Sequence, residues 1–155
     1  TLPGFMGDIG YAQSNRERYE GFCQALTDAG KKVDSSLCLT TPLGIDTYRE
    51  EIDTFLSSLS RMPDAFVCAS DYVACILMQL LEKRGLRVPE DVAVSGFDNN
   101  TEDLLAEHLT TVQVFNEELG ARLALQILYR IKYPNTPHEI TYLGTNVLYR
   151  DSTGD

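Results

Sequence analysis

The chain has 155 residues, 43% of them hydrophobic, and a net charge of −10 from 13 Lys and Arg against 23 Asp and Glu. This length and apolar content suffice for one domain with a sizeable core. The negative charge repels a phosphate backbone, which argues against direct nucleic-acid binding by these residues. No apolar run approaches the roughly 20 residues of a membrane span, and no signal-peptide pattern opens the sequence.

Four cysteines form no C-x-x-C pair and have no histidine at metal-ligand spacing: Cys23, Cys38, Cys68 and Cys75. We therefore expect reduced side chains in the core and no metal site. Reduced cysteines favour a cytoplasmic location, although a secreted protein without its signal would show the same pattern.

Short apolar runs of strand length recur along the chain. Five of them predict buried strands, at residues 2–6, 36–41, 65–69, 92–97 and 110–114. Two weaker strand candidates follow, at 140–143 and 147–149. Residues 152–155 carry no such pattern and are expected to be frayed.

Helical periodicity fills the intervals between these runs. The predicted helix starts are the capping boxes Ser14–Glu17 and Thr47–Glu50, then Ser70 or Asp71, and finally Asn116. Gly30 and Gly85 predict the ends of the first and third helices, because glycine readily takes the left-handed cap conformation. A short helix is expected near 102–107, and the last helix is expected to run to Lys132.

Alternating strands and helices with short connections imply right-handed crossovers, and therefore a doubly wound, mostly parallel α/β sheet. Ligands bind such sheets outside the carboxyl ends of the strands. The segments that follow the predicted strands are rich in polar residues, at 8–18, 70–71 and 98–100. A ligand site is therefore expected at this edge.

Arg18 and Asp98 are the two charged residues of this edge best suited to a small polar ligand. A carboxylate accepts hydrogen bonds from adjacent hydroxyls, and a guanidinium donates a fork of them. Two alternatives remain open from the local sequence. In the first, Asp98 only caps the following helix, and in the second, Arg18 only forms a surface ion pair.

Enzyme signatures are weak throughout the sequence. There is no G-x-S-x-G motif, no Walker loop and no dinucleotide fingerprint after the first strand. His108 at a helix end and His138 in a proline-flanked loop suit capping or solvated roles. We therefore expect no catalytic residue, no metal and no cofactor.

Four segments are distinctive in their order and spacing: Arg18–Phe22, Pro63–Asp71, Arg84–Asn99 and Leu109–Gly120. Together they resemble the effector-binding core of the LacI/GalR family of bacterial transcription regulators. The resemblance implies a Rossmann-like subdomain of a type I periplasmic-binding-protein fold, in which two subdomains close on a small effector.

Carried over position by position, the resemblance implies that Arg18 and Asp98 contact the effector. The predicted effector-binding residues are Arg18, Asp98, Ser14, Ser70, Asp71 and Asn116. Pro42 and Asn116 fall near positions that are aromatic in several sugar-binding members. These departures leave the apolar face of a sugar without an evident stacking partner.

The resemblance also implies that the chain is about half of a regulator. Residues 1–114 would form the C-terminal effector-binding subdomain without its first helix. Residues 115–143 would cross to the N-terminal subdomain, and 144–155 would be a return strand and tail. DNA would be contacted only through a missing helix-turn-helix head.

Helix 116–132 would then expose an apolar stripe formed by Leu119, Leu123, Ile127, Leu128 and Ile131. Burying each such side chain stabilises a protein by about 1.5–3 kcal/mol, so lasting exposure is unfavourable. We expect the helix either to fold back onto the sheet or to exchange with a second copy in a swapped homodimer.

The leading prediction is a part of a transcriptional regulator that senses a sugar or sugar derivative and allosterically controls DNA binding. The alternative is a solute-binding lobe of a sugar transport system, which shares the architecture. A small α/β enzyme is a third and weaker reading.

Overall fold

The computed structural model describes every residue except 45, 100–103 and 155, and it confirms the predicted α/β class. Among the described residues, the main sheet contains four parallel strands in the order β2-β1-β3-β4. Their bounds are β1 Pro3–Met6, β2 Cys38–Leu39, β3 Ala65–Cys68 and β4 Ala93–Ser95. The predicted strands 36–41 and 92–97 are thus shorter than expected. A 3-10 turn at Ser35–Leu37, capped by Asp34, occupies the start of the former.

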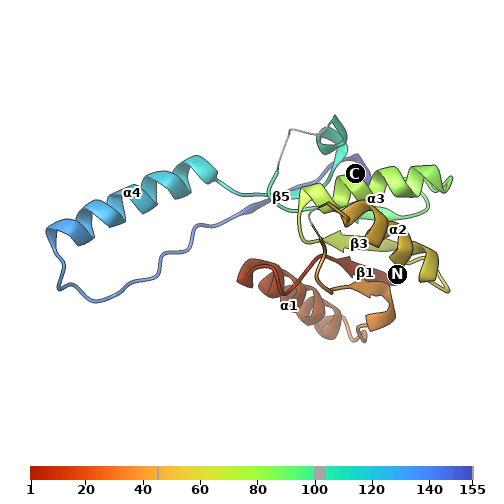
Figure 1. Cartoon of the computed structure of the whole chain (residues 1–155), viewed down its shortest axis with the longest axis horizontal. Helices are drawn as coiled ribbons and strands as arrows, with labels where there is room; N and C mark the ends of the chain where they lie inside the picture. Colours follow the sequence, from red (N-terminus) through yellow and green to blue (C-terminus); the bar gives the residue numbers. More distant parts are fainter. Residues whose placement is uncertain (45, 100–103, 155) are drawn as a thin grey trace.

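Three helices cover the two faces of this sheet (Figure 1). Helix α1, Gln13–Asp28, lies on one face, and α2, Tyr48–Ser58, and α3, Asp71–Lys83, lie on the other. Alternating strand side chains explain the arrangement, since Phe5 packs with the α1 cluster and its neighbour Met6 packs with the α2 and α3 cluster.

A fifth strand continues the sheet. Strand β5, Thr111–Gln113, runs parallel to β4 through bridges between Ser95 and Thr110 and between Asp98 and Gln113. Its other side pairs antiparallel with β6, Asn146–Leu148. The predicted strand at 140–143 is wrong, because these residues form no strand.

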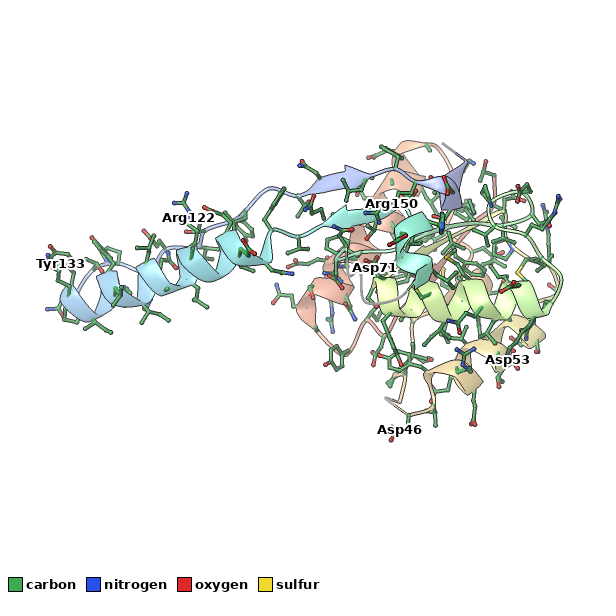
Figure 2. All side chains as sticks on the ribbon, turned by 90° about the horizontal axis from the view of Figure 1, so that it is seen from above. Asp46, Asp53, Asp71, Arg122, Tyr133 and Arg150 are labelled. Atoms are coloured by element: carbon green, nitrogen blue, oxygen red, sulfur yellow. The ribbon has the colours of Figure 1, made fainter. Side chains whose placement is uncertain are left out.

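Helix α4, Asn116–Lys132, and the return segment 133–145 form an arm that extends away from the sheet (Figures 1 and 2). No residue of α4 is buried in the described structure. The predicted fold-back of this helix onto the sheet is therefore wrong. Helices α1, α2 and α3 already occupy sheet faces, and the connections after β5 and before β6 direct the arm outward.

Two predicted capping residues lie inside their helices. Helix α1 begins at Gln13, so Ser14 is helical rather than an N-cap. Asn116 is the first residue of α4, and Phe115 precedes it without a side-chain cap. Thr47 does precede α2, but its hydroxyl donates to Glu51 Oε1 instead of accepting a backbone N–H.

The other helix ends follow the prediction. Ser70 caps α3, its hydroxyl accepting from the N–H of Val73 at 3.4 Å. Gly30 and Gly85 follow α1 and α3 with φ of 69° and 73°, the left-handed region that favours glycine. The short helix predicted near 102–107 lies partly outside the described residues, and a 3-10 helix spans Leu104–His108.

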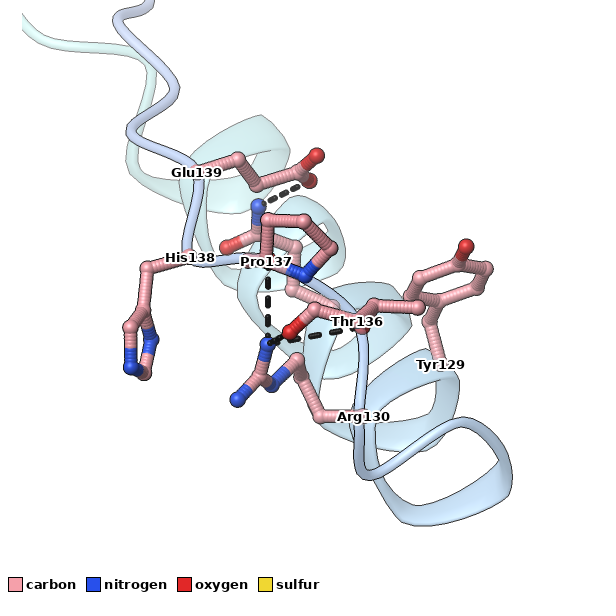
Figure 3. Close-up of a pocket in the computed structure, with 7 residues that line it drawn as sticks. Tyr129, Arg130, Thr136, Pro137, His138 and Glu139 are labelled. Atoms are coloured by element: carbon pink, nitrogen blue, oxygen red, sulfur yellow. Dashed lines mark hydrogen bonds between the residues drawn. The ribbon is translucent and has the colours of Figure 1, made fainter.

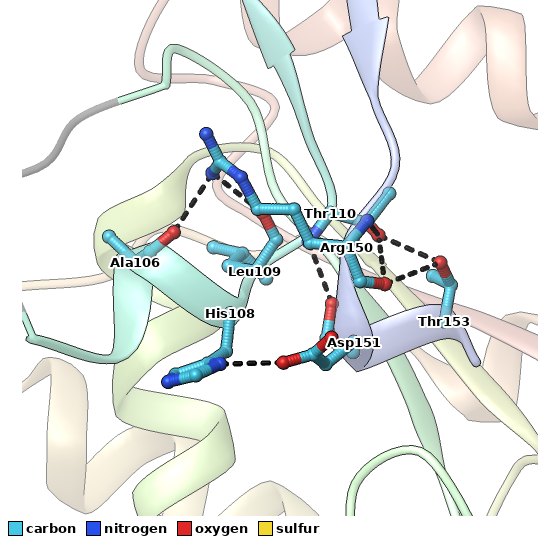
Figure 4. Close-up of polar contacts among 8 residues, drawn as sticks. Ala106, His108, Leu109, Thr110, Arg150, Asp151 and Thr153 are labelled. Atoms are coloured by element: carbon cyan, nitrogen blue, oxygen red, sulfur yellow. Dashed lines mark hydrogen bonds and ion pairs between the residues drawn. The ribbon is translucent and has the colours of Figure 1, made fainter. Parts of the chain in front are cut away.

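The C-terminal tail is anchored, so its predicted fraying is wrong for residues 152–154. Residues Asp151–Thr153 form a 3-10 turn in which Ser152 is 1% exposed. Its hydroxyl donates to Val94 O and accepts from the N–H of Thr110. His108 Nδ1 contacts Asp151 Oδ2 at 2.7 Å nearby (Figure 4).

All four cysteines are free: Cys68 and Cys75 are buried, while Cys23 and Cys38 are half-buried. Burial raises the pKa of the Cys68 thiol, which keeps it protonated and unreactive. In the described part of the chain, no group of three or more His, Cys, Asp or Glu could hold a metal ion. No described helix combines the length and apolarity that a bilayer crossing needs.

Candidate functional site

Arg18 reaches from the second turn of α1 across the carboxyl ends of β3 and β4. Its Nη1 donates to the carbonyl oxygen of Ala69 at 2.5 Å, and its Nη2 lies 3.3 Å from Asp98 Oδ1. These two residues are 80 positions apart in the sequence. The structure thus brings together the pair that the sequence placed at this edge.

The Arg18 guanidinium also lies over an aromatic ring. Its Cζ is 3.6 Å from the ring centroid of Phe97, the residue before Asp98. This cation–π contact restricts the plane of the guanidinium, whose Nη1 also donates to Asn15 Oδ1 at 3.5 Å. Sequence reasoning missed Phe97, although its place beside the strand-end aspartate was the available signal.

The backbone at Asp98 adopts an unusual conformation. Asp98 has φ of 110° and Asn99 has φ of 53°, both in the region that L-residues rarely occupy. Hydrogen bonds from the N–H of Asp98 to Val112 O and from Arg150 Nη2 to Asn99 Oδ1 hold this turn. Such strain at a strand end is typical of a site whose side chain must point in a particular direction.

The charges of Arg18 and Asp98 are only partly compensated. Burial raises the pKa of Asp98, while Arg18 lowers it and Asp71 raises it further. Burial also lowers the pKa of Arg18, against the opposing effect of Asp98. Additional hydrogen-bond partners would therefore stabilise both ionised groups, as ligand hydroxyls do.

Asp71 lies close behind this pair but faces the protein interior. It is 2% exposed and accepts a hydrogen bond from Thr111 Oγ1 at 2.5 Å. Gly96 leaves the space that the carboxylate fills, since a Cβ there would lie 2.2 Å from Asp71 Oδ1. Asp71 therefore joins α3 to β5. Burial lowers the pKa of Arg18 and raises that of Asp98, and the charge of Asp71 opposes the first shift and adds to the second.

The remaining predicted residues lie in different surroundings. Ser70 is half-buried at the start of α3, beside Ala69. Ser14 is exposed on α1, and Asn116 is exposed at the base of the arm, beyond β5. Among the described residues, hydrogen bonds join Arg18 to Asp98 and to Ala69, the neighbour of Ser70, and none joins Arg18 or Asp98 to Ser14 or Asn116.

A hollow of about 410 Å³ lies elsewhere, on the arm (Figure 3). It is lined by Gln126, Tyr129, Arg130 and residues 136–139. Arg130 Nη1 donates to the carbonyl oxygens of Thr136 and Pro137 there, which holds the turn after α4. This hollow is remote in sequence and structure from Arg18 and Asp98.

A family model, described as a periplasmic binding protein-like domain, matches residues 4–153. The chain belongs to this family. This match, together with the relatives and solved structures described next, confirms the predicted fold and the resemblance to LacI-family regulators. In this periplasmic-binding-protein-like domain, the Arg18–Asp98 pair occupies the carboxyl edge, where ligands bind open α/β sheets.

Two curated relatives are regulators. The HTH-type transcriptional regulator DegA of Bacillus subtilis is 34% identical over 117 residues, covering 75% of this chain and 34% of the relative. The HTH-type transcriptional regulator CelR of Thermobifida fusca is 34% identical over 142 residues, covering 88% of this chain and 40% of the relative. The chain therefore spans well under half the length of either regulator.

Two solved structures share the fold of nearly the whole chain. A transcriptional regulator CelR–cellobiose complex has a TM-score of 0.86 and 28% identity, covering 97% of this chain and 46% of that one. A LacI-family regulator from Sanguibacter keddieii has a TM-score of 0.84 and 28% identity, covering 99% and 58%. The named relatives are regulators rather than enzymes.

Proposed function

We propose that this chain is the effector-sensing part of a bacterial transcriptional regulator and that its effector is a sugar or sugar derivative. The observation that carries the proposal is the Arg18–Asp98 pair over Phe97 at the carboxyl edge of the sheet. A relative solved in complex with cellobiose supports a carbohydrate.

Binding would proceed through exchange of hydrogen bonds. Asp98 accepts from two adjacent ligand hydroxyls, and the Arg18 guanidinium donates to the ligand oxygens. The ligand then supplies hydrogen-bond partners that replace the water lost by both charged groups on burial. Neither step forms or breaks a covalent bond, in keeping with a sensor rather than an enzyme.

The arm provides the route by which binding reaches the rest of the regulator. The N–H of Asp98 donates to Val112 on β5, which leads into α4. The side chain of Asn99 accepts from Arg150, which follows β6. A movement of residues 98–99 therefore acts on both strands that carry the arm, and would shift the balance between DNA-competent and DNA-incompetent states.

Residues 1–114 and 144–155 would form one wall of the effector site, and 115–143 would pack on a second subdomain. DNA contact belongs to a helix-turn-helix head outside these residues, and the regulator would act in the cytoplasm as a homodimer. The exposed apolar side chains of α4 support the proposal that the arm packs against another protein surface. A swapped exchange of 116–132 between two copies remains a prediction.

Isothermal titration calorimetry of the full-length gene product with a panel of mono- and disaccharides tests the proposal. Arg18→Ala and Asp98→Ala should each abolish binding of whichever sugar binds. Arg87→Ala is the matched control, because Arg87 forms an ion pair with Asp91 on an exposed surface. Full binding in both site variants would refute the site.

A solute-binding lobe of a transport system is the second candidate, and the regulator relatives disfavour it. An electrophoretic mobility shift with the operator region of the same gene separates the two. A sugar-dependent change in DNA binding supports the regulator, and sugar binding without any DNA binding supports the transport protein.

A further inference from the structure

Three tyrosines gather at the same edge of the sheet as Arg18 and Asp98. The rings of Tyr48 and Tyr72 are 5.6 Å apart and perpendicular, at 89°. Burial raises the pKa of Tyr48, and electrostatic interactions with Asp8, Tyr11, Tyr72 and Glu51 raise it further. Tyr72 is nevertheless 58% exposed and Tyr11 is 73% exposed.

The tyrosines come from three consecutive connections at the carboxyl ends of the strands. Tyr11 follows β1, Tyr48 begins α2 after β2, and Tyr72 is the second residue of α3 after β3. Since β1 lies between β2 and β3, these connections are neighbours. Tyr72 is also three residues beyond Ala69, whose carbonyl oxygen binds Arg18.

Asp8 holds two of these connections, the one that carries Tyr11 and the one that leads to Tyr48. Its Oδ1 accepts from the N–H groups of Gly10 and Tyr11 at 2.7 and 3.0 Å, and its Oδ2 accepts from the N–H of Leu43 at 3.3 Å. Asp8 is 7% exposed. The carboxylate thus ties the connection after β1 to the one after β2.

The spacing of the strands sets the size of the ligand. Asp98 follows β4, and the tyrosines follow β3, β1 and β2, which come next in order across the sheet. Neighbouring strands are about 4.8 Å apart, so the connections that carry Tyr72, Tyr11 and Tyr48 begin one, two and three spacings from β4, and the nearest, that of Tyr72, begins ~5 Å away. That distance suits a second sugar ring linked to the one held by Arg18 and Asp98.

We propose that Tyr72, whose ring packs edge-to-face with Tyr48, is a second subsite that packs on the apolar face of a sugar ring, so that the effector is a disaccharide or longer oligosaccharide. Aromatic rings with a polar tip suit such ligands, which present an apolar face and hydroxyls at its rim. The inference rests on the proposed sugar-sensing function. It supplies the stacking partner that Pro42 and Asn116 do not.

Calorimetric titration of the full-length gene product with glucose and cellobiose, and with their galactose and lactose counterparts, tests the subsite. The wild-type protein should bind the preferred disaccharide at least tenfold more tightly than its monosaccharide unit. Tyr72→Ala should weaken the disaccharide about tenfold and the monosaccharide less than twofold. Tyr72→Phe should keep the wild-type preference, because it keeps the ring.

Tyr149→Ala is the matched control, since Tyr149 is 68% exposed and follows Leu148, which pairs with Thr111 at the opposite end of β5. It should leave both affinities unchanged. Equal affinity for monosaccharide and disaccharide, with no effect of Tyr72→Ala, would overturn the subsite, while loss of binding in Arg18→Ala would still support the sensor. Absence of all sugar binding would overturn both.

Discussion

Arg18 and Asp98 contact each other at 3.3 Å, yet the pKa of each is shifted toward its neutral form. In an ordinary stabilising ion pair, the pKa of the acid falls and that of the base rises. Here burial outweighs the mutual attraction, so the pair is better suited to receiving a polar ligand than to stabilising the fold.

Asp98→Asn should therefore not destabilise the protein at pH 7. Because the pKa of Asp98 is raised above 3.8, the native state binds this proton more tightly than the unfolded state. The stability that the group contributes is fully present below pH 3.8 and is lost as pH rises through the raised pKa. In thermal unfolding between pH 3.5 and 7, the stability of the variant should fall less with rising pH than that of the wild-type protein. The variant should also lose sugar binding at pH 7.

Asp91→Asn is the control of opposite sign for this experiment. Hydrogen bonding to Arg87 lowers the pKa of Asp91, so its contribution is present above the unfolded pKa and is lost on acidification. The variant should show no gain in stability at pH 7. A clear loss of stability at pH 7 in Asp98→Asn would contradict our interpretation of the pair.

Phe97→Leu should weaken sugar binding without unfolding the protein. Leucine retains apolar contact but removes the aromatic face 3.6 Å from Arg18. A cation–π contact of this kind is worth about 0.5–2 kcal/mol, which corresponds to roughly twofold to thirtyfold in affinity. Titration calorimetry measures the affinity, and circular dichroism verifies the fold. Wild-type affinity in the leucine variant would show that Phe97 does not position the guanidinium.

Gly96→Ala should destabilise the protein, since the added Cβ would lie 2.2 Å from Asp71 Oδ1 and 3.1 Å from Asp71 Cα. Overpacking of this kind costs about 1–3 kcal/mol in the free energy of unfolding. Gly21→Ala is the matched control, because nothing lies within 4 Å of its added Cβ and it sits inside α1. That change should raise the free energy of unfolding by up to about 1 kcal/mol. Urea denaturation of both variants measures whether the free energy of unfolding falls in the first and rises in the second.

Ser152→Ala should destabilise the tail and the sheet together. The substitution leaves Val94 O and the N–H of Thr110 without the hydroxyl that serves both. A buried polar group without its partner costs about 1–3 kcal/mol. Ser14→Ala, on the exposed surface of α1, should stay within about 0.5 kcal/mol of wild type. Equal stability of the two variants would mean that the tail is not anchored as described.

The 155-residue chain alone should self-associate through the arm. Leu123, Leu128 and Ile131 of α4 are 59%, 64% and 72% exposed. Covering each stabilises the assembly by about 1.5–3 kcal/mol. Size-exclusion chromatography with light scattering should show dimers or larger species, and Leu123→Glu with Leu128→Glu should yield monomers. A wild-type chain that remains monomeric at high concentration would contradict this prediction.

The helix ends and strands of the core were predictable because their signals are local. Gly85 after α3 and Ser70 before it act on their own backbone, and the apolar run 65–69 suits only a buried strand. The caps at Ser14 and Asn116 were wrong for the same reason, since a capping pattern does not reveal where tertiary contacts make a helix begin.

The sequence by itself determined the alternating α/β class and the edge at which Arg18 and Asp98 meet, because strand and helix patterns are local and right-handed crossovers put the carboxyl ends of parallel strands at one edge. Tertiary structure alone decided the rest. It placed Phe97 beneath Arg18, buried Asp71 against Thr111, tied the tail to Val94 and packed Tyr72 against Tyr48. These contacts join residues that are far apart in the chain or on different elements, and only the packed sheet fixes their distances.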